Sequence, residues 1–272
     1  MQGLATEGYI RERIEPAPGD PAYLHLTDLL LGLKTLMPSN ITRILDYGCG
    51  GSPYRSLFGS CTYHRADLAG DFPVDFKYGP DSRLPAELAD YDCVLSTQVL
   101  EHVLSPTAYL AEAYRVLRPG SHLLLSTHGL FEDHFCPYDY WRWTVYGLRK
   151  LVEETGFKID RILKLTTGPR AAMFLAEREL FTWGFKDPAR LRFKGPGSIL
   201  SSILTLFQFS LSSRGREHFY THMLHYAMRV VQFMDAKRRH DACDASFPRY
   251  RMADPGEPGH DMYIAVAVLA HR

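Results

Sequence analysis

The sequence predicts an α/β fold: a doubly wound, mostly parallel sheet with a helical insertion before its last strand. Short apolar runs alternate with helical apolar spacing through residues 39–168, a pattern typical of strands and helices that follow one another along a parallel sheet. A glycine-rich turn follows the first of these strands. About ninety residues, 169–260, then precede the last strand, whereas most connections have about 4–6 residues.

Residues 1–38 are expected to form an N-terminal arm and one helix. The first twenty residues are polar and contain Pro16 and Pro18, which favours an N-terminal arm. Residues 22–37 have apolar positions at helical spacing and end before a proline, so they predict a helix.

The core, residues 39–168, is expected to contain six strands joined largely by helices. Compact apolar runs predict strands at 41–48, 62–68, 73–79, 92–97, 121–127 and 158–165. Helical spacing predicts helices at 85–89, 106–117 and 144–155, and a further helix is expected to start near Pro53. The final strand is predicted within residues 261–272.

The insertion, residues 169–260, is expected to be a helical cap. Apolar spacing predicts helices at 171–185 and 218–239. The uncharged run 198–213 is shorter than the roughly 20 residues of a spanning helix and rich in serine, so it favours a buried helix. A helix on a membrane surface is the alternative. Peripheral membrane contact or dimer contact through residues 196–240 therefore stays open.

Composition narrows the partners and the compartment. Lysine plus arginine and aspartate plus glutamate are both 31, so there is no basic field to attract nucleic acid, and no nucleic-acid partner is expected. The five cysteines are scattered and lack CxxC spacing, which favours reduced thiols. The first sixteen residues lack the apolar core of a signal peptide. A cytoplasmic protein is expected, with contact to the inner face of the membrane left open.

The turn after the first predicted strand carries the strongest chemical signal. Glycines such as Gly48 and Gly50 let a ligand approach the backbone closely. Asp46 places a carboxylate two residues before Gly48, which suits a ligand with a cationic ammonium and sulfonium. Pro53 stands where a dinucleotide fingerprint has its third glycine. Asp67, at the end of the second strand, is suited to accept hydrogen bonds from both ribose hydroxyls of a nucleoside.

With these features the chain resembles the class I S-adenosylmethionine (SAM)-dependent methyltransferases, within the broad type 11 group. The matching segments are ILDYGCGGSPY (44–54), RADL (65–68), DSRLP (81–85), DYDCVLSTQVLEHV (90–103) and YRVLRPGSHLLLST (114–127). The resemblance covers residues 40–168. It implies a Rossmann-like sheet of seven strands with an antiparallel last strand, SAM as cofactor and S-adenosylhomocysteine as product.

The resemblance also implies cofactor contacts at the first two strands. Asp46, Gly48 and Gly50 would surround the methionyl part of SAM. Asp67 would hold the ribose, and Leu68 would pack against the adenine.

Further implied contacts follow the third and fourth strands. Asp81 and Ser82 match the segment that contacts the adenine amino group. Ser96, Thr97 and Gln98 would face the cleft of the methyl donor. A local structural role is the alternative for each of these five residues and for Leu68.

The segment HFCPYDYWRWT (134–144) follows the fifth strand, where open α/β sheets build their sites. Similar strings occur in type 11 proteins encoded with bacterial glycan-assembly enzymes, which favours a glycan or small-molecule acceptor. Asp139, Tyr140, Trp141 and Arg142 are the predicted acceptor contacts. The alternative is that the aromatic rings anchor the loop while Arg142 pairs with Asp139.

Transfer of methyl to an alcohol needs a proton acceptor, and histidine is suited to that role near neutral pH. His134 is the first candidate because it belongs to this loop, and His102 and His128 are the others. Asp133 and Cys136 lie beside His134, but no residue elsewhere completes a metal-ligand spacing, so no metal is expected.

The sequence therefore predicts a SAM-dependent methyltransferase acting on a small molecule or glycan, with oxygen as the expected acceptor atom. A nicotinamide-dependent oxidoreductase on the same fold is one alternative. A methyltransferase-like binding module without turnover is another.

Overall fold

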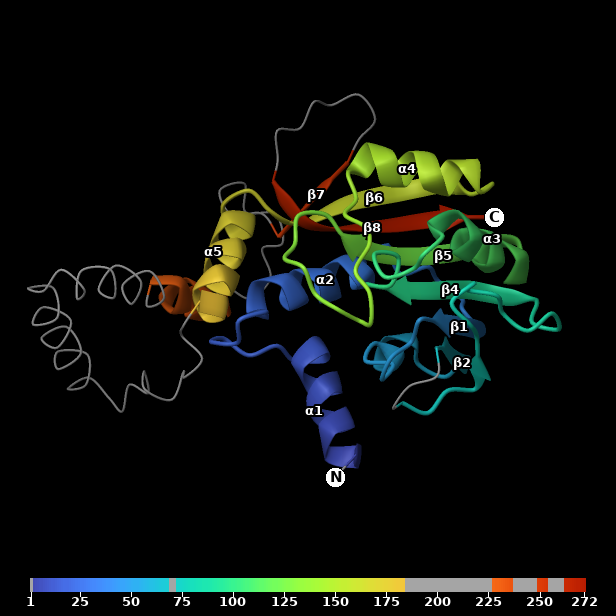
Figure 1. Cartoon of the computed structure of the whole chain (residues 1–272), viewed down its shortest axis with the longest axis horizontal. Coiled ribbons are helices and arrows are strands. Elements are labelled where there is room, and N and C mark those ends of the chain that lie inside the picture. Colours follow the sequence, from blue (N-terminus) through green and yellow to red (C-terminus); the bar gives the residue numbers. More distant parts are fainter. Residues whose placement is uncertain (1, 69–71, 184–226, 237–248, 254–261) are drawn as a thin grey trace, which may run out of the picture. The chain divides into compact units, whose positions relative to one another are not determined.

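A computed structural model of the chain describes residues 2–68, 72–183, 227–236, 249–253 and 262–272 (Figure 1). The chain divides into two compact units. One comprises Met1–Pro16, His25–Ala171 and Ala242–Arg272, and the other comprises Ala17–Leu24 and Ala172–Asp241. The first unit contains the sheet.

The helices and strands have the following bounds: α1 (Gln2–Ile14), α2 (Tyr23–Leu36), β1 (Arg43–Tyr47), β2 (Thr62–Asp67), β3 (Phe76–Lys77), β4 (Tyr91–Thr97), α3 (Pro106–Val116), β5 (Leu117–His128), α4 (Val145–Glu154), β6 (Lys158–Thr167), α5 (Pro169–Trp183), β7 (Tyr250–Met252) and β8 (Tyr263–His271). Residues 227–236 are also helical.

The sheet has eight strands in the order β3-β2-β1-β4-β5-β8-β6-β7. The first five strands pair in parallel, and β8 lies antiparallel between β5 and β6. The predicted α/β class and antiparallel last strand are therefore confirmed. The chain leaves β1 toward β2 on one side and reaches β4 on the other, so a crevice is expected where the carboxyl ends of β1 and β4 meet.

The predicted number of strands, seven, is wrong by one. The additional strand, β7, pairs antiparallel with β6 at the sheet edge, with Met252 opposite Leu163. It comes from the segment predicted to be an insertion without strands. A strand of three residues is too short to produce the alternation by which strands are recognised.

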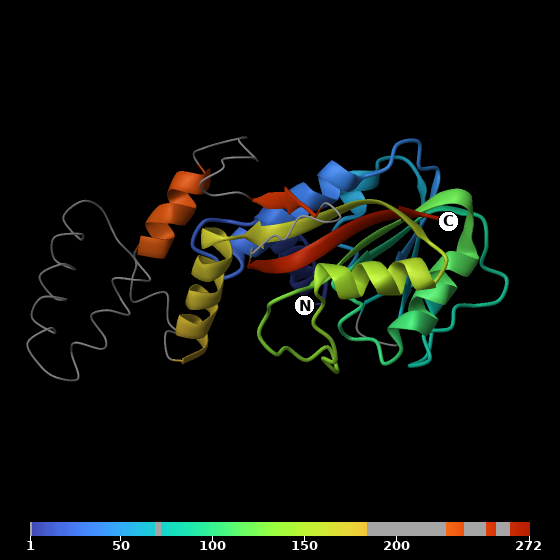
Figure 2. The ribbon, with the colours of Figure 1, turned by 90° about the horizontal axis from the view of Figure 1, so that it is seen from above.

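Helices cover both faces of the sheet, as Figure 2 shows for α2 on one side and α3 and α4 on the other. Neighbouring residues of β1 point into different layers: Leu45 packs with the residues of α3 and α4, whereas Ile44 packs with those of α2. This near-continuous burial explains why the strands have compact apolar sequences instead of alternating ones.

Three segments differ from the predicted helices. Residues 2–14, within the expected N-terminal arm, form α1; Ile10 and Ile14 lie one turn apart, and Ile14 packs against the α2 layer. The segment after β1 contains only a 3-10 turn at Arg55–Phe58, which ends at Gly59. The segment 85–89 is a turn instead of the expected helix. Both stretches are too short for a stable helix.

The second unit joins α5 to the helical residues 227–236. Gln232 is buried; its amide donates to Glu177 at 2.7 Å, and its carbonyl oxygen accepts from the Gly19 backbone N–H at 2.6 Å. The expected helices at 171–185 and 218–239 are confirmed over α5 and residues 227–236. The uncharged run 198–213 lies outside the described residues. Among the helices that are described, none has the length and apolar character needed to cross a membrane.

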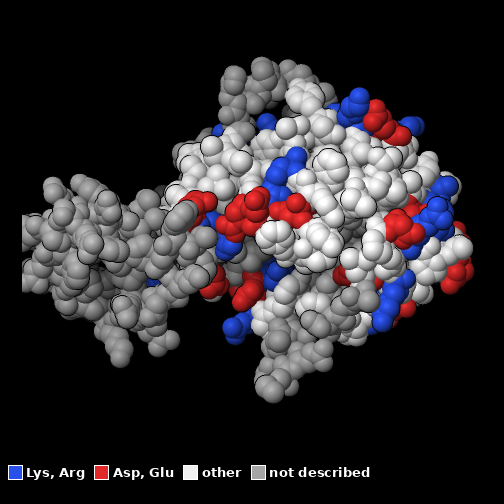
Figure 3. Space-filling view, in the orientation of Figure 1, with Lys and Arg blue, Asp and Glu red and all other residues white. Residues whose placement is uncertain are grey.

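The surface charge is mixed. Figure 3 shows lysine and arginine interspersed with aspartate and glutamate on the face in view. Several of these charges are paired, as in Arg115 with Glu112 at 2.9 Å and Arg65 with Asp75 at 2.9 Å. On this face the described charges form no large field of one sign.

Candidate cofactor and acceptor site

The turn after β1 is held tightly against its neighbours. Gly48 adopts a φ of 76° and Gly50 a φ of 48°, both in the left-handed region that favours glycine. The Gly48 N–H donates to the Ala66 carbonyl at 2.8 Å. A Cβ built on Gly48 would lie 2.5 Å from both methyl carbons of Val99. Glycine at these two positions therefore meets a conformational requirement, and at Gly48 also a steric one.

Asp67 closes the other side of this turn. One carboxylate oxygen accepts from the Gly50 N–H at 2.6 Å, and the other accepts from the Leu68 N–H at 2.7 Å. Because of this clamp, the acidic residue at the end of β2 and the glycine turn after β1 form one structure. The predicted residues Gly48, Gly50, Asp67 and Leu68 thus lie together at the expected crevice.

Asp46 lies at the end of β1 with only 3% of its surface exposed. One carboxyl oxygen accepts from the Tyr63 hydroxyl at 2.6 Å. Burial raises its pKa to about 7, while the hydrogen bond from Tyr63 opposes the increase. A cationic ligand beside this carboxyl would restore the ionised form, because opposite charges favour each other.

This carboxyl predicts that cofactor affinity depends on pH. Below about pH 7 the buried acid is protonated in the free protein, so binding of an ammonium group must release that proton. We expect the affinity for S-adenosylhomocysteine to fall as the pH drops from about 8 to about 6, approaching tenfold per unit. Calorimetry across this range measures the change, and Asp46→Asn should remove it. An unchanged wild-type affinity would contradict the prediction.

The same raised pKa makes the stability of the free protein fall as the pH rises. The neutral acid is favoured by the fold, so its stabilising contribution is complete below the ordinary value of 3.8 and is lost as the pH rises through about 7. Stability and cofactor affinity should therefore respond to this carboxyl with opposite signs.

The residues predicted to contact the adenine and the methyl group of SAM differ in their exposure to solvent. Ser82 is buried at a φ of 61°, and its carbonyl accepts from the Tyr47 hydroxyl, whereas Asp81 is exposed. Thr97, the last residue of β4, and Gln98, which follows it, are partly exposed. Gln98 has a φ of 56°, and a strained backbone at a strand end is typical of functional turns.

Ser96 does not face the cleft. Its side chain is fully buried, and its hydroxyl lies 2.8 Å from the Tyr109 hydroxyl, which in turn donates to the Tyr47 carbonyl. The prediction is wrong here because alternate residues of β4 point to opposite faces of the sheet. Ser96 fixes the ends of β1 and β4 relative to α3 instead of contacting a ligand.

Tyr9 of α1 lies against the glycine turn and was not predicted to belong to the site. Its hydroxyl lies 3.1 Å from the position of a Cβ on Gly50, and its ring carbons would contact a Cβ on Gly51. The ring also packs near Phe72, and the Arg13 guanidinium stacks on it at 3.6 Å. The polar composition of residues 1–20 concealed this contact, since only tertiary structure brings α1 to the turn.

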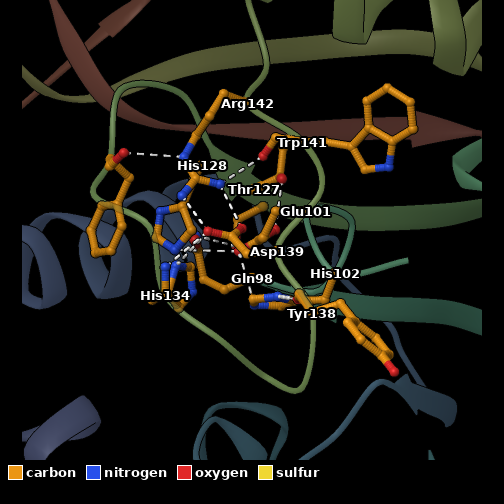
Figure 4. A network of polar contacts seen from close by, with 12 residues as sticks. Gln98, Glu101, His102, Thr127, His128, His134, Tyr138, Asp139, Trp141 and Arg142 are labelled. Atoms are coloured by element: carbon orange, nitrogen blue, oxygen red, sulfur yellow. Dashed lines mark hydrogen bonds and ion pairs between the residues drawn. The ribbon is translucent and has the colours of Figure 1, made fainter. Parts of the chain in front are cut away.

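Three predicted histidines meet at the carboxyl ends of β4 and β5 (Figure 4). The His134 ring lies edge-on to His102 and His128, with centroid distances of 4.7 and 4.9 Å. His128 is buried and stacks on Phe131 at 3.8 Å. Burial lowers the pKa of all three imidazoles. The cluster therefore presents neutral rings.

Glu101 lies beneath these rings and is completely buried. One carboxyl oxygen accepts from the Thr127 hydroxyl at 2.7 Å, and the other lies 3.3 Å from Nε2 of His128. Burial raises its pKa to about 7. Its backbone carbonyl accepts from the N–H groups of Tyr140 and Trp141. The acid thus ties the turn after β4 to the aromatic loop.

The aromatic loop is locked by the pair that the alternative interpretation expected. Arg142 donates to both carboxylate oxygens of Asp139 at 2.6 Å. Burial acts to raise the pKa of Asp139, but the Arg142 and His134 N–H hydrogen bonds hold it at about 2. With 4% of its side chain exposed, Asp139 is not placed to contact an acceptor, which corrects that prediction. Arg142 also donates to the Phe131 and Glu132 carbonyls.

Tyr140 and Trp141 remain candidates for acceptor contact. The Trp141 indole N–H donates to the Val103 carbonyl at 2.9 Å, while 41% of the residue is exposed. Tyr140 lies near Tyr138, and both rings are exposed. One edge of each residue is therefore fixed or packed while a face is open.

Removing the Arg142 side chain should loosen this loop. Arg142→Met leaves the Asp139 carboxylate without its cation, and we expect a loss of about 2 kcal/mol in the free energy of unfolding. Urea unfolding measures the change. S-adenosylhomocysteine affinity should remain within about twofold of wild type. Arg149→Met is the matched control, because Arg149 forms an exposed pair with Glu153 that contributes about 0.5 kcal/mol.

Together, the strand order, the glycine turn after β1 and the acidic residue at the end of β2 define a nucleoside-binding domain of the class I methyltransferase type. Residues 11–162 match the family described as "Methyltransferase domain", and the chain belongs to this family. The match includes α2 and part of α1, which lie before the expected core. These residues form a SAM-dependent methyltransferase domain.

Two curated relatives agree with this assignment. A ubiquinone biosynthesis O-methyltransferase of Dinoroseobacter shibae is 36% identical over 35% of this chain and 44% of its own length. A probable SAM-dependent methyltransferase of Mycolicibacterium smegmatis is 30% identical over 46% of this chain and 55% of its own length. The chain thus spans about half the length of these relatives. They give no support to the nicotinamide alternative.

Among solved structures, the [4+2]-cyclase SpnF is similar in fold. The match has a TM-score of 0.50 and 14% identity, and covers 99% of this chain and 92% of that one. At this identity the likeness concerns the fold alone. It also shows that the fold does not determine the reaction.

Proposed function

We propose that the chain transfers the methyl group of SAM to a hydroxyl oxygen of a sugar-like acceptor, free or within a glycan. The observation that carries the proposal is the group of neutral imidazoles beside Gln98, under a loop with open aromatic faces. Aromatic faces can pack against sugar rings, while nearby polar groups select hydroxyls. Oxygen is favoured as the acceptor atom because several relatives bear the name O-methyltransferase.

The chemistry requires alignment and one proton acceptor. SAM, held by Asp46, Gly48, Gly50 and Asp67, would supply an electrophilic methyl group on a sulfonium sulfur, and S-adenosylhomocysteine would be the neutral-sulfur product once the acceptor oxygen carries the methyl group. The hydroxyl proton passes to a neutral imidazole among His134, His102 and His128. Holding oxygen, carbon and sulfur in line supplies much of the acceleration, and proton removal contributes the rest.

A hydroxylated aromatic ring is the second candidate acceptor. It is supported by the names of the relatives in ubiquinone biosynthesis and by the exposed rings of Tyr140 and Trp141, which can stack on a planar ligand. Both candidates share the same cofactor, turn and proton acceptor, so they differ only in the ring that carries the hydroxyl.

The test begins with calorimetry of S-adenosylhomocysteine, with NADH as the parallel control. Methyl-labelled SAM is then incubated with the protein and separate pools of sugars, catechol-like phenols and primary amines. Label on a sugar oxygen supports the proposal, and label on phenols alone supports the second candidate. Label on amines overturns the choice of oxygen. Cofactor binding without transfer to any pool favours the binding module.

A further inference from the structure

We propose that Glu101, His102 and His134 bind a divalent transition-metal ion at the floor of the acceptor site. Only the ion's use in catalysis rests on the function proposed above; its binding does not. The sequence predicted no metal because Asp133 and Cys136 add no ligand spacing to His134. The three residues named here come from two segments that only the fold brings together.

The geometry supplies three donor atoms around one point. One carboxyl oxygen of Glu101 and one ring nitrogen from each of His102 and His134 lie within 4.8 Å of one another. Figure 4 shows the two rings and the carboxylate gathered beneath the aromatic loop. Glu101 is fully buried and the histidines are partly buried. Modest rotations would bring the donors to the distances of about 2.0–2.2 Å found at metal centres.

The hydrogen-bonding pattern leaves the three ligand atoms as acceptors that carry no hydrogen. Nδ1 of His102 lies 2.6 Å from the Tyr138 carbonyl and must carry the hydrogen, so in the neutral ring Nε2 is an acceptor. That Nε2 faces a carboxyl oxygen of Glu101 at 3.9 Å. When Glu101 is ionised and His102 is neutral, neither of these two atoms can donate to the other. The same Glu101 oxygen makes no hydrogen bond, although Nε2 of His128 lies 3.3 Å from it, and Nδ1 of His134 is also buried without one.

Among the described residues, no basic side chain compensates the charge of this carboxylate. In the described part of the chain, no lysine or arginine lies within ion-pair distance of Glu101. Arg142, which belongs to the aromatic loop, uses its guanidinium N–H groups to donate to the Asp139 carboxylate and to backbone carbonyls. A buried carboxylate is costly unless it is paired or coordinates a metal. The neutral imidazoles beside it are in the form that metals bind.

Outer contacts would hold each ligand in place. The Thr127 hydroxyl fixes the second oxygen of Glu101, the Tyr138 carbonyl orients His102, and the Asp139 carboxylate accepts from the His134 backbone N–H at 2.9 Å. Such contacts orient first-sphere ligands at metal centres. Two imidazoles and one carboxylate suit zinc, iron(II), manganese(II) or cobalt(II) better than magnesium or calcium.

Three protein ligands leave coordination positions for the acceptor. Oxygen atoms of the acceptor could occupy them, and an ion there would make the acceptor hydroxyl more acidic. His128 is not part of the ligand group. Its Nε2 approaches Glu101 and its ring stacks on Phe131, so it remains the imidazole that can receive the proton.

The test uses the full chain after chelator treatment, with cobalt(II) as an optical probe and zinc(II) as competitor. We expect one cobalt(II) per chain, a visible absorption band and displacement by zinc(II). Glu101→Gln and His134→Asn should each weaken cobalt(II) binding more than about 100-fold. His122→Asn, in the middle of the strand that ends at His128, is the matched control and should bind like wild type.

Cofactor binding separates this inference from the proposed function. The S-adenosylhomocysteine affinity of each variant shows whether its fold is intact. His134 lies in a loop, so His134→Asn is the ligand variant least expected to disturb folding. The metal inference is overturned if wild type binds S-adenosylhomocysteine but no cobalt(II), or if both ligand variants retain cobalt(II) at wild-type affinity. Failure of wild type to bind S-adenosylhomocysteine would instead count against the proposed function.

Discussion

Asp67→Ala is expected to weaken the binding of S-adenosylhomocysteine about 100-fold. If Asp67 accepts from both ribose hydroxyls, each lost charged hydrogen bond contributes about 1.5–3 kcal/mol, and about 1.4 kcal/mol corresponds to a tenfold change in affinity. The substitution also frees the Gly50 N–H from its 2.6 Å contact, so the turn loses its clamp. Calorimetric titration of the purified variant measures the effect.

Two further variants show whether the loss belongs to the ribose contact. Asp67→Asn keeps the shape and one acceptor, and it should lose about tenfold. Asp160→Ala removes a carboxylate of β6 that pairs with His271, and it should bind like wild type. Equal affinities for Asp67→Ala and wild type would refute the placement of the ribose at the end of β2.

The cofactor half of the site could be predicted because its signals are local. A strand, a glycine turn and an acidic residue 19 positions after Gly48 occupy a short stretch of chain whose spacing reflects the turn itself. The structure adds the reason for that spacing, since Asp67 accepts from the backbone of Gly50. By contrast, the side chain of Ser96 was predicted to point toward the cleft, whereas it points to the opposite side of β4. Periodicity identifies a strand that is buried on both sides but not the direction of each side chain.

The acceptor half depended on contacts that spacing does not contain. Glu101 and His102 are adjacent in the segment 90–103, yet only the histidine was selected. The sequence gives no sign that Glu101 is completely buried, since glutamate seldom is. Its importance follows from Thr127 beside it and from His134 in another loop. Tyr9 was missed for the same reason. Its ring reaches the glycine turn through the fold, from a segment whose composition resembled a polar arm.

Gly48→Ala is expected to be the most damaging single change in the cofactor turn. A left-handed φ of 76° costs an alanine about 1–2 kcal/mol. The added methyl would also lie 2.5 Å from both methyl carbons of Val99, and overpacking costs about 1–3 kcal/mol. We expect a loss of about 3 kcal/mol in the free energy of unfolding. S-adenosylhomocysteine affinity should fall because the turn must shift, and urea unfolding with calorimetry measures both effects.

Gly120→Ala separates the two causes. Gly120 has nearly the same φ, 77°, but a Cβ there meets nothing within 4 Å, so this variant should lose only the backbone contribution of about 1–2 kcal/mol. Combining Gly48→Ala with Val99→Ala removes the methyl groups in the way and should recover part of the stability and of the cofactor affinity. If Gly48→Ala and Gly120→Ala were equally destabilised, the contact with Val99 would have no role, and the glycine would be required for its φ alone.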